Sequence, residues 1–274
     1  MLQKGFSQQE RDQMKPNYKN WVPKNMLYLL GFFAVLCYVA AMILQWALHD
    51  GITKIIWSSV LLVTAVLLTV VFLWMTRMHC AFSYEGKRKL SKGIIEGLAG
   101  HVEVPEKGLV LDVGCGSGAL TIAVAKRNPS ATVIGVDRWG KEYASYNKSL
   151  CEKNAKAEGV NRVEFREGDA VQLDFPDESF DAVVSNYVYH NITGVDRQQV
   201  LLETLRVLKK GGSFALHDIF SKGKYGDMPS FIKKLKGMGY EKVQMIDTTD
   251  GKFMTKKEAA MYSLRHSAIL YGRK

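Results

Sequence analysis

The chain has 274 residues, of which 47% are hydrophobic and 23% charged, and these ordinary fractions exclude a disordered, collagen-like or coiled-coil chain. Four cysteines, none in a Cys-x-x-Cys pair or at zinc-ligand spacing from a histidine, exclude a disulfide scaffold and predict no metal site. The 37 basic and 27 acidic residues give a net charge of +10, which favours either a nucleic acid or an anionic membrane surface as a partner.

Two long uncharged stretches lie near the N-terminus of the chain, at residues 26–48 and 55–76. At about 1.5 Å per residue, each is long enough to cross a hydrocarbon core of roughly 30 Å. Tryptophan and tyrosine lie near their ends, where interfacial aromatic side chains are common in membrane proteins. Two buried helices of a soluble core are the alternative, but such helices rarely run this far without a charge. We therefore expect a transmembrane helical hairpin with residues 49–54 as its loop.

The basic residues that flank the hairpin predict its orientation. Those before it are Lys4, Arg11, Lys15, Lys19 and Lys24, and those after it are Arg77, Lys87, Arg88, Lys89 and Lys92. The loop carries Lys54 alone, so we expect a two-pass membrane protein with both termini and the catalytic domain in the cytoplasm. Each base near an anionic headgroup contributes about 1 kcal/mol, and this use of the positive charge favours lipid over nucleic acid as the partner.

The expected organisation has four parts. Residues 1–25 form a basic cytoplasmic segment, 26–76 the hairpin, 77–100 a juxtamembrane lid or linker helix, and 101–274 the soluble domain. Leu90, Ile94 and Leu98 share one face of the linker helix, which predicts that it covers a binding site at the membrane interface. An anchor without a lid role is the alternative.

Short β-branched runs alternate with helical stretches after residue 100, which predicts an α/β fold with a mostly parallel sheet. The expected strands are 108–113, 131–137, 162–167, 180–186, 212–219, 241–248 and 266–271. The expected helices are 119–128, 141–158, 196–208 and 229–238.

A glycine-rich turn follows the first of these strands, in the segment Asp112 to Gly118. Glycine permits positive φ and lets the backbone approach a ligand closely, and a helix start offers free N–H groups. Gly114-x-Gly116-x-x-Ala119 also fits the dinucleotide fingerprint, with Asp137 in place to bind a ribose. Three features favour S-adenosylmethionine over NAD: Asp112 two residues before the first glycine, Gly118, and Asp169 after the third strand.

At these motifs the chain resembles the class I S-adenosylmethionine-dependent methyltransferases. The matching segments are LDVGCGSGAL (111–120), VIGVDRW (133–139), EGDAVQLDFPDESFDAVVSN (167–186) and LKKGGSFALHDI (208–219). The resemblance covers roughly residues 90–274. It implies a Rossmann-like seven-stranded sheet with helices on both faces and an antiparallel last strand. It also implies S-adenosyl-L-methionine as the cofactor and S-adenosyl-L-homocysteine as the product.

The resemblance further assigns a cofactor role to each matching position. Asp112, Gly114 and Gly116 would hold the methionine part, Asp137 the ribose, Arg138 and Trp139 the adenine faces, Asp169 and Ala170 the adenine amino edge, and Asn186 the side near the methyl group. Cys115 and Gly168 complete the expected set.

The segment after the fourth strand, residues 186–191, is expected to meet the acceptor. His190 is the first candidate for a base, since histidine exchanges protons near neutral pH. Tyr187 and Tyr189 are expected to shape the pocket, and His217 and Asp218 are second candidates. The Pro-Pro pair of DNA and protein-amide methylases is absent, and Ser185-Asn186-Tyr187-Val188 is more like the small-molecule enzymes.

The sequence therefore predicts a membrane-anchored methyltransferase that acts on a small, lipophilic thiol, amine, hydroxyl or quinone-like carbon, with no metal and no nucleic-acid partner. Three alternatives stay open. These are a non-catalytic membrane protein that binds S-adenosylmethionine, an NAD-dependent oxidoreductase, and an RNA or protein methylase recruited to the membrane. The oligomeric state is not predicted.

Overall fold

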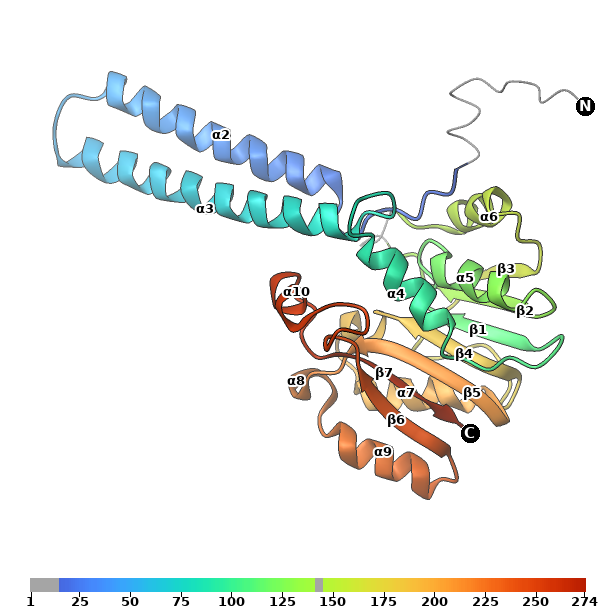
Figure 1. Ribbon diagram of the computed structural model, residues 1–274. Helices are drawn as coiled ribbons and strands as arrows, with labels where there is room; N and C mark the ends of the chain where they lie inside the picture. The colour runs from blue at the N-terminus through green and yellow to red at the C-terminus, as the bar shows by residue number, and fades with distance from the viewer. Residues whose placement is uncertain (1–14, 141–144) are drawn as a thin grey trace, which may run out of the picture. The chain divides into compact units, whose positions relative to one another are not determined.

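The computed structural model describes residues 15–140 and 145–274 (Figure 1). It divides into two compact units. One contains residues 19–92, and the other joins the chain up to Tyr18 to residues 93–274. The residues just before the hairpin thus group with the soluble domain. Lys4, Arg11 and the first four residues of the helix expected at 141–158 lie outside the described residues.

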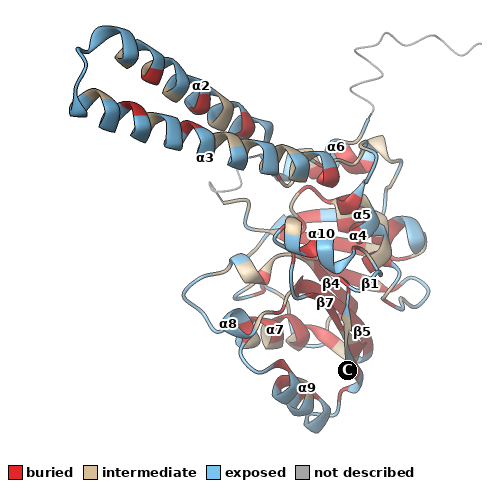
Figure 2. Cartoon of the chain, turned by 60° about the vertical axis from the view of Figure 1, so that its left-hand side comes forward, coloured by how far each residue is buried: buried red, intermediate tan, exposed pale blue. Residues whose placement is uncertain are grey.

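The unit of residues 19–92 is built on two long antiparallel helices, α2 (Lys24–Ala47) and α3 (Ile52–Phe82). Both are long and apolar enough to cross a membrane, with a mean hydropathy of 2.5 in their most apolar windows. Only 17% and 11% of those windows are buried, and Figure 2 shows both helices largely exposed. A core helix of a soluble protein would bury most of this surface, so the exposure favours a lipid environment.

The buried positions of the hairpin recur at a spacing of seven residues. Those at this spacing are Leu27, Ala34 and Ala41 on α2 and Ser58 and Ala65 on α3, and Ala81 and Phe82 are also buried at the end of α3. Small side chains at such a seam let two helix backbones approach closely, which is how helices pack where no water drives association.

Helix α3 continues six residues beyond its expected end at residue 76. The last turns have polar partners from the segment before α2: His79 Nδ1 lies 2.7 Å from the Val22 carbonyl oxygen, and Asn20 Nδ2 donates to the His79 carbonyl at 2.9 Å. The rings of Trp21 and Phe82 pack 5.1 Å apart between centroids. These contacts stabilise helix beyond the point where hydrophobicity alone predicts its end.

The other unit is a seven-stranded sheet, as expected. Its strands are β1 (Leu109–Val113), β2 (Thr132–Asp137), β3 (Val163–Glu167), β4 (Phe180–Asn186), β5 (Leu208–Ile219), β6 (Glu241–Asp247) and β7 (Ser267–Arg273). They lie in the order β3-β2-β1-β4-β5-β7-β6, and β7 pairs antiparallel with both of its neighbours. The expected Rossmann-like sheet with an antiparallel last strand is confirmed.

Helices cover both faces of this sheet (Figure 1). They are α4 (Leu90–Ala99), α5 (Ala119–Arg127), α6 (Lys148–Ala157), α7 (Arg197–Arg206), α8 (Lys222–Tyr225), α9 (Met228–Gly237) and α10 (Lys256–Met261). Strand residues alternate between two apolar clusters: Val110 packs with α4 and α5, whereas Leu111 packs with α7 and α9. This alternation is the pattern of a sheet buried on both faces.

The expected apolar face of α4 is buried at Leu90, Ile94 and Leu98. Ile95 and Leu98 belong to the same cluster as Val110, so the second half of α4 is part of the domain core. The sequence analysis missed two short helices, α8 and α10. A capping box at α10, in which Thr255 and Glu258 exchange hydrogen bonds with each other's backbone N–H, was the signal available for the latter.

Candidate functional site

The glycine-rich turn lies where the strand order of the sheet reverses. Strands β1 and β4 are neighbours, and the chain leaves them in opposite directions, towards β2 and β5. The carboxyl ends of such a strand pair are where ligands bind in open α/β sheets. The order also differs from the all-parallel 3-2-1-4-5-6 of dinucleotide-binding folds, because antiparallel β7 lies between β5 and β6. The topology therefore argues against the NAD alternative.

Gly114 and Gly116 of the turn serve different purposes. Gly114 (φ +74°) packs so closely against the next loop that a Cβ there would lie 2.3 Å from Val188 Cγ2. Gly116 (φ +56°) has nothing within 4 Å of the position of a Cβ. Gly114 is thus required by packing between the β1 and β4 loops. Gly116 leaves open space beside its backbone, as a cradle for a ligand needs.

Asp137, at the end of β2, braces the turn. Its Oδ2 accepts the Gly116 N–H and its Oδ1 accepts the Trp139 N–H, both at 2.8 Å. The Trp139 indole N–H in turn donates to the Gly116 carbonyl at 3.0 Å. Trp139 has a φ of +41°, which is uncommon for a bulky residue and often marks a functional site. A carboxylate has about four lone-pair positions, so Asp137 retains capacity for ribose hydroxyls.

The residues expected around the adenine also come together. Arg138 Nη1 lies 3.9 Å from Asp169 Oδ2, and the Gly168 N–H donates to the Asp137 carbonyl at 3.1 Å. Gly168 therefore ties the end of β3 to the end of β2, with Ala170 two residues further on. The ion pair is half-exposed and contributes little to stability.

Asp112 lies behind the turn, almost fully buried. Its Oδ2 accepts the Thr121 hydroxyl at 2.6 Å, whereas its Oδ1 has no hydrogen-bond partner among the described residues. Burial raises the pKa of Asp112 to about 7, and the nearby charge of Asp137 acts in the same direction, against the Thr121 hydrogen bond. An orphaned buried carboxylate oxygen beside an open glycine fits a ligand with a positively charged amino group.

Cys115 contributes to the turn through its backbone. Its N–H donates to the Val136 carbonyl at 3.0 Å, and its carbonyl accepts the Gly118 N–H at 2.8 Å. The thiol is buried, and burial raises the pKa of Cys115 well above its ordinary value, with a hydrogen bond to the Cys151 side chain adding to the shift. The side chain is therefore a neutral packing group.

His190 and Asp218 form a pair across the ends of β4 and β5. His190 lies in the short 3-10 turn η2 (Tyr189–Asn191), and its Nδ1 is 2.6 Å from Asp218 Oδ1. The His190 backbone N–H also donates to Asp218 Oδ2, at 3.2 Å. Asp218 is fully buried and the His190 side chain is 15% exposed. A buried carboxylate on Nδ1 fixes the imidazole tautomer and leaves Nε2 as the nitrogen able to take a proton from a ligand.

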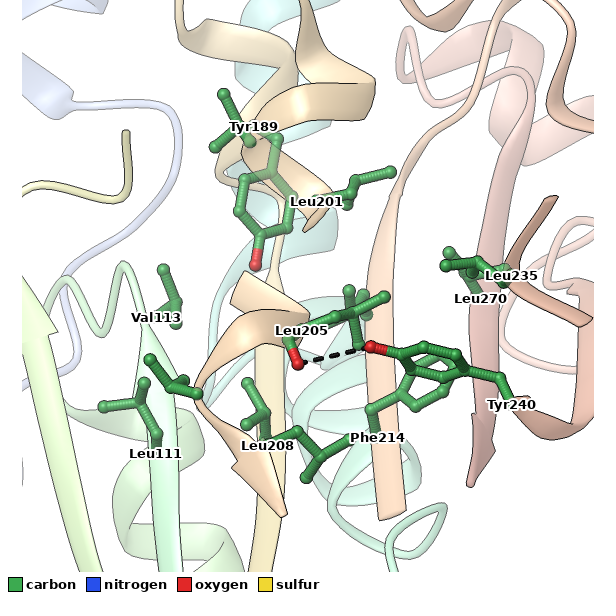
Figure 3. Close-up of a cluster of buried hydrophobic side chains, with 14 of the residues drawn as sticks. Leu111, Val113, Tyr189, Leu201, Leu205, Leu208, Phe214, Leu235, Tyr240 and Leu270 are labelled. Atoms are coloured by element: carbon green, nitrogen blue, oxygen red, sulfur yellow. Dashed lines mark hydrogen bonds between the residues drawn. The ribbon is translucent and has the colours of Figure 1, made fainter. Parts of the chain in front are cut away.

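Tyr189 does not shape a pocket, contrary to the expectation. Its side chain is fully buried in the core with Leu201 and Leu205, as Figure 3 shows, and its hydroxyl lies 3.0 Å from Thr204 Oγ1. The chain turns into η2 directly after Val188, and this change of direction points Tyr189 into the sheet. Neighbouring His190 then faces the carboxyl edge of the sheet.

His217 is also wrong as a candidate base. It is fully buried, and its two ring nitrogens lie 2.8 Å from Asn186 Oδ1 and 2.9 Å from Thr248 Oγ1. Burial lowers the pKa of His217 to about 3, so the ring is neutral and both nitrogens have partners. Its role is to hold Asn186, another of the expected cofactor residues, at the end of β4.

Tyr187 lies between the two histidines. Its ring centroid is 4.5 Å from that of His217 and 6.0 Å from that of His190, and its hydroxyl lies 2.8 Å from Ser267 Oγ. Burial raises the pKa of Tyr187, which therefore stays protonated. Its φ of +56° is uncommon for an aromatic residue and turns the chain sharply after β4. Tyr187 thus packs the wall beside His190.

Four residues that make polar contacts in the site are not among those expected from the sequence. Thr121 holds Asp112, and Arg197 binds the carbonyls of Tyr189, His190 and Lys224. From α6, Cys151 donates to the Gly116 carbonyl and Asn154 to the Ser117 carbonyl. Cys151 and Asn154 lie three residues apart on one buried face of α6. A buried asparagine needs hydrogen-bond partners, so an asparagine at this position was the available sequence signal for such a contact.

Comparison with known proteins agrees with this geometry. Residues 111–216 match the family described as methyltransferase domain. A demethylmenaquinone methyltransferase of Geobacillus stearothermophilus is 34% identical over 137 residues, which cover 50% of this chain and 54% of that protein. An arsenite methyltransferase of Aquipseudomonas alcaligenes is 35% identical over 122 residues, or 43% of this chain and 34% of that protein. The chain thus spans about half or less of the length of these relatives.

Solved structures with the same fold include a geranyl diphosphate methyltransferase in complex with S-adenosylmethionine and the [4+2]-cyclase SpnF. Each has a TM-score of 0.53, at 16% and 19% identity, and each alignment covers 68% of this chain and 86% and 82% of the other. At these identities the similarity shows the fold alone. The sheet is that of the class I S-adenosylmethionine-dependent methyltransferases, and the expected resemblance is confirmed.

The buried carboxyl of Asp112 yields a prediction about stability and pH. The folded state holds a proton on Asp112 up to about pH 7, whereas the unfolded chain releases it near pH 4. Wild-type stability therefore falls as the pH rises between these values, and Asp112→Asn lacks this loss. We expect the unfolding free energy of Asp112→Asn, relative to wild type, to rise by roughly 1–3 kcal/mol from pH 5 to pH 8.

Thermal unfolding in detergent at several pH values measures this difference, and Asp181→Asn is the matched control. Burial alone would raise the pKa of Asp181, but hydrogen bonds from the Leu109 N–H and Lys209 hold it below its ordinary value. Asp181→Asn should therefore show a difference that is constant from pH 5 to pH 8. A constant difference for Asp112→Asn as well would show that Asp112 is ionised in the folded protein.

Proposed function

We propose that this chain, whose residues 111–216 are a methyltransferase domain, transfers a methyl group from S-adenosylmethionine to a small acceptor held beside His190. The observation that carries the proposal is the convergence of two loops at the strand-order reversal. One presents the open glycine turn with its carboxylates, and the other presents a histidine oriented by a buried aspartate. The first loop suits the cofactor, and the second suits an acceptor that must lose a proton.

The residues present fit this cofactor. The orphaned Asp112 Oδ1 behind the turn suits the positive amino group, Gly116 leaves room for close approach, and Asp137 has lone pairs left for ribose hydroxyls. Arg138 and Trp139 follow Asp137 directly, and the proposal assigns them to the adenine. When bound, S-adenosylmethionine supplies a methyl group already activated by its sulfonium. The chain therefore has to align the acceptor and remove its proton.

His190 and Asp218 perform that second task in the proposal. Nε2 of His190 takes the proton of a hydroxyl, thiol, ammonium or activated ring carbon. The buried Asp218 carboxylate stabilises the imidazolium that results and keeps Nε2 aimed at the acceptor. Tyr187, protonated and packed against both histidines, closes the wall behind the imidazole.

The hairpin supports the finer proposal of a membrane-anchored enzyme with a lipophilic acceptor. Its helices expose large apolar side chains along their length, including Phe32, Trp46, Ile55 and Leu67. A demethylmenaquinone methyltransferase is named for a quinone-type acceptor, and such a molecule partitions into the bilayer. The basic flanks favour a two-pass topology with both termini on the cytoplasmic side, and we retain α4 as the element that leads from the bilayer to the domain.

The cofactor assignment is tested by calorimetric titration of the full-length protein in detergent. We expect wild type to bind S-adenosylmethionine with a dissociation constant in the micromolar range and NAD not measurably. Asp137→Ala should abolish the binding, because it removes both the ribose contact and the brace of the turn. A melting curve of Asp137→Ala checks that the variant is folded. Binding of NAD in place of S-adenosylmethionine would favour an oxidoreductase.

The proposed base is tested by turnover with saturating cofactor. We expect His190→Ala to lower kcat by about 10²–10³-fold and to leave the dissociation constant of S-adenosylmethionine within about threefold of wild type. Asp218→Asn should have a similar effect, because it removes the charge that orients the imidazole. The control is His266→Asn, a change at an exposed histidine outside the site. Turnover unchanged in His190→Ala would remove His190 from the mechanism, and no turnover in wild type with any acceptor would favour the non-catalytic alternative.

Membrane topology is tested by labelling single cysteines in right-side-out vesicles. In a Cys80→Ser background, Gly51→Cys lies in the hairpin loop, where a Cβ meets nothing within 4 Å, and Lys107→Cys lies before β1. We expect a membrane-impermeant maleimide to label Gly51→Cys in intact vesicles and Lys107→Cys only after permeabilisation. The reverse pattern would invert the proposed topology. Release of the protein by alkaline carbonate would contradict the anchor.

A further inference from the structure

The segment that precedes the membrane hairpin is docked on the soluble domain. The docked part is residues 15–18, which we call the strap, whereas residues 19–23 belong to the unit of the hairpin. The Asn17 N–H donates to Asn154 Oδ1 at 2.7 Å, and Asn154 Nδ2 donates to the Asn17 carbonyl at 3.1 Å. Tyr18 is buried, and its hydroxyl donates to Glu158 Oε1 at 3.0 Å. Asn154 lies in the last turn of α6 and Glu158 is the residue that caps its C-terminal end, so the strap is held by side chains 137 and 140 residues away in sequence.

Asn154 also holds the cofactor turn. Its Nδ2 donates a second hydrogen bond, to the Ser117 carbonyl at 2.9 Å, and Asn154 as a whole is only 2% exposed. One turn earlier on α6, Cys151 donates to the Gly116 carbonyl at 3.2 Å. Helix α6 thus fixes the carbonyls of two consecutive turn residues, while the Gly116 N–H is fixed on the other side by Asp137.

One buried amide therefore connects the strap to the turn. An asparagine side chain has two donor hydrogens and one acceptor oxygen with two lone pairs, and here the donors serve the strap and the turn at the same time. Loss of the strap would remove two of the three hydrogen bonds that hold the Asn154 amide. The amide would then be free to rotate away from Ser117, because a buried polar group seeks other partners.

We propose that Asn154 is a positioning residue for the cofactor, and that docking of the strap onto Asn154 and Glu158 is required for full affinity of the turn for S-adenosylmethionine. This inference rests on the proposed function. It makes the catalytic domain discontinuous, with the hairpin inserted between the strap and α4. Since α2 begins at Lys24, six positions after Tyr18, the anchor is directly continuous with an element that sets cofactor affinity.

Thermodynamic linkage supplies a test that a purely structural role would not pass. If the docked strap strengthens cofactor binding by some factor, bound cofactor must favour the docked strap by the same factor. The Asn17 amide is the natural probe, because its N–H is bonded to Asn154 Oδ1. We expect S-adenosylmethionine to slow hydrogen exchange in the peptide that contains residues 15–18 of the full-length protein in detergent.

Two substitutions measure the other side of the linkage. Asn154→Ala should raise the dissociation constant of S-adenosylmethionine roughly tenfold, with kcat at saturating cofactor within about twofold of wild type, and the cofactor should no longer slow exchange in the strap. Tyr18→Phe removes the hydroxyl that donates to Glu158 and leaves Asn154 unchanged. It should raise the dissociation constant by about two- to threefold. Unlike Asn154→Ala, it keeps the buried amide of Asn154, so its fold is not at risk from that loss.

Asn128→Ala is the matched control, since Asn128 Nδ2 donates to a backbone carbonyl, that of Val124 at 2.9 Å, at the far end of α5. It should leave cofactor affinity unchanged even if it lowers the melting temperature. Wild-type affinity in both Asn154→Ala and Tyr18→Phe, or cofactor-independent exchange in the strap, would overturn the proposal while the proposed function stands. Failure of wild type to bind S-adenosylmethionine would overturn both.

Discussion

The conformation of one five-residue turn constrains most of this domain. Residues 114–118 must leave β1 at positive φ, pass within van der Waals distance of the β4 loop at Val188 and start α5. Contacts from three directions stabilise this backbone conformation. Asp137 accepts a turn N–H, α6 donates to two turn carbonyls, and Phe165 and Thr121 pack behind it.

The same close packing explains a glycine outside the turn. A Cβ on Gly135, in the middle of β2, would lie 2.7 Å from Thr121 Oγ1 and 2.9 Å from Cys115 Cβ. Gly135 therefore lets α5 approach the sheet near enough for the Thr121 hydroxyl to reach Asp112. The buried carboxylate, its hydroxyl partner and the missing side chain of Gly135 form one packing unit behind the cofactor cradle.

Much of the architecture followed from local sequence patterns, because those patterns act over a few residues. Alternating apolar runs gave all seven strands, and Asp112, Asp137 and Asp169 each stand at the end of a strand, where a spacing argument is strong. Sequence patterns could not decide which of Tyr189 and His190 faces the site. The two are adjacent in sequence, and only the turn into η2 decides that one enters the core and the other faces the site.

Hydrogen-bond partners that lie far apart in sequence could not be predicted from local patterns for the same reason. Asp218 was a candidate on its own, but its pairing with His190 depends on the register of β4 against β5, where Asn186 lies opposite His217. The link between Asn17 and Asn154 spans the whole hairpin, and nothing in the composition of residues 15–18 distinguishes them from a basic leader. Hydrophobic periodicity predicts burial, whereas hydrogen-bond partners depend on the assembled fold.

The position of the strap sets an order for biosynthesis. Residues 15–18 leave the ribosome before α2 and α3, yet they bond to Asn154 in α6 and to Glu158 just after it, 137 and 140 residues away in sequence. Residues 15–18 must therefore remain undocked while the hairpin and then β1 to α6 are made. Contacts of such long sequence separation form late and slowly. Until they form, a newly made chain would be largely folded, with residues 15–18 still exposed to proteases.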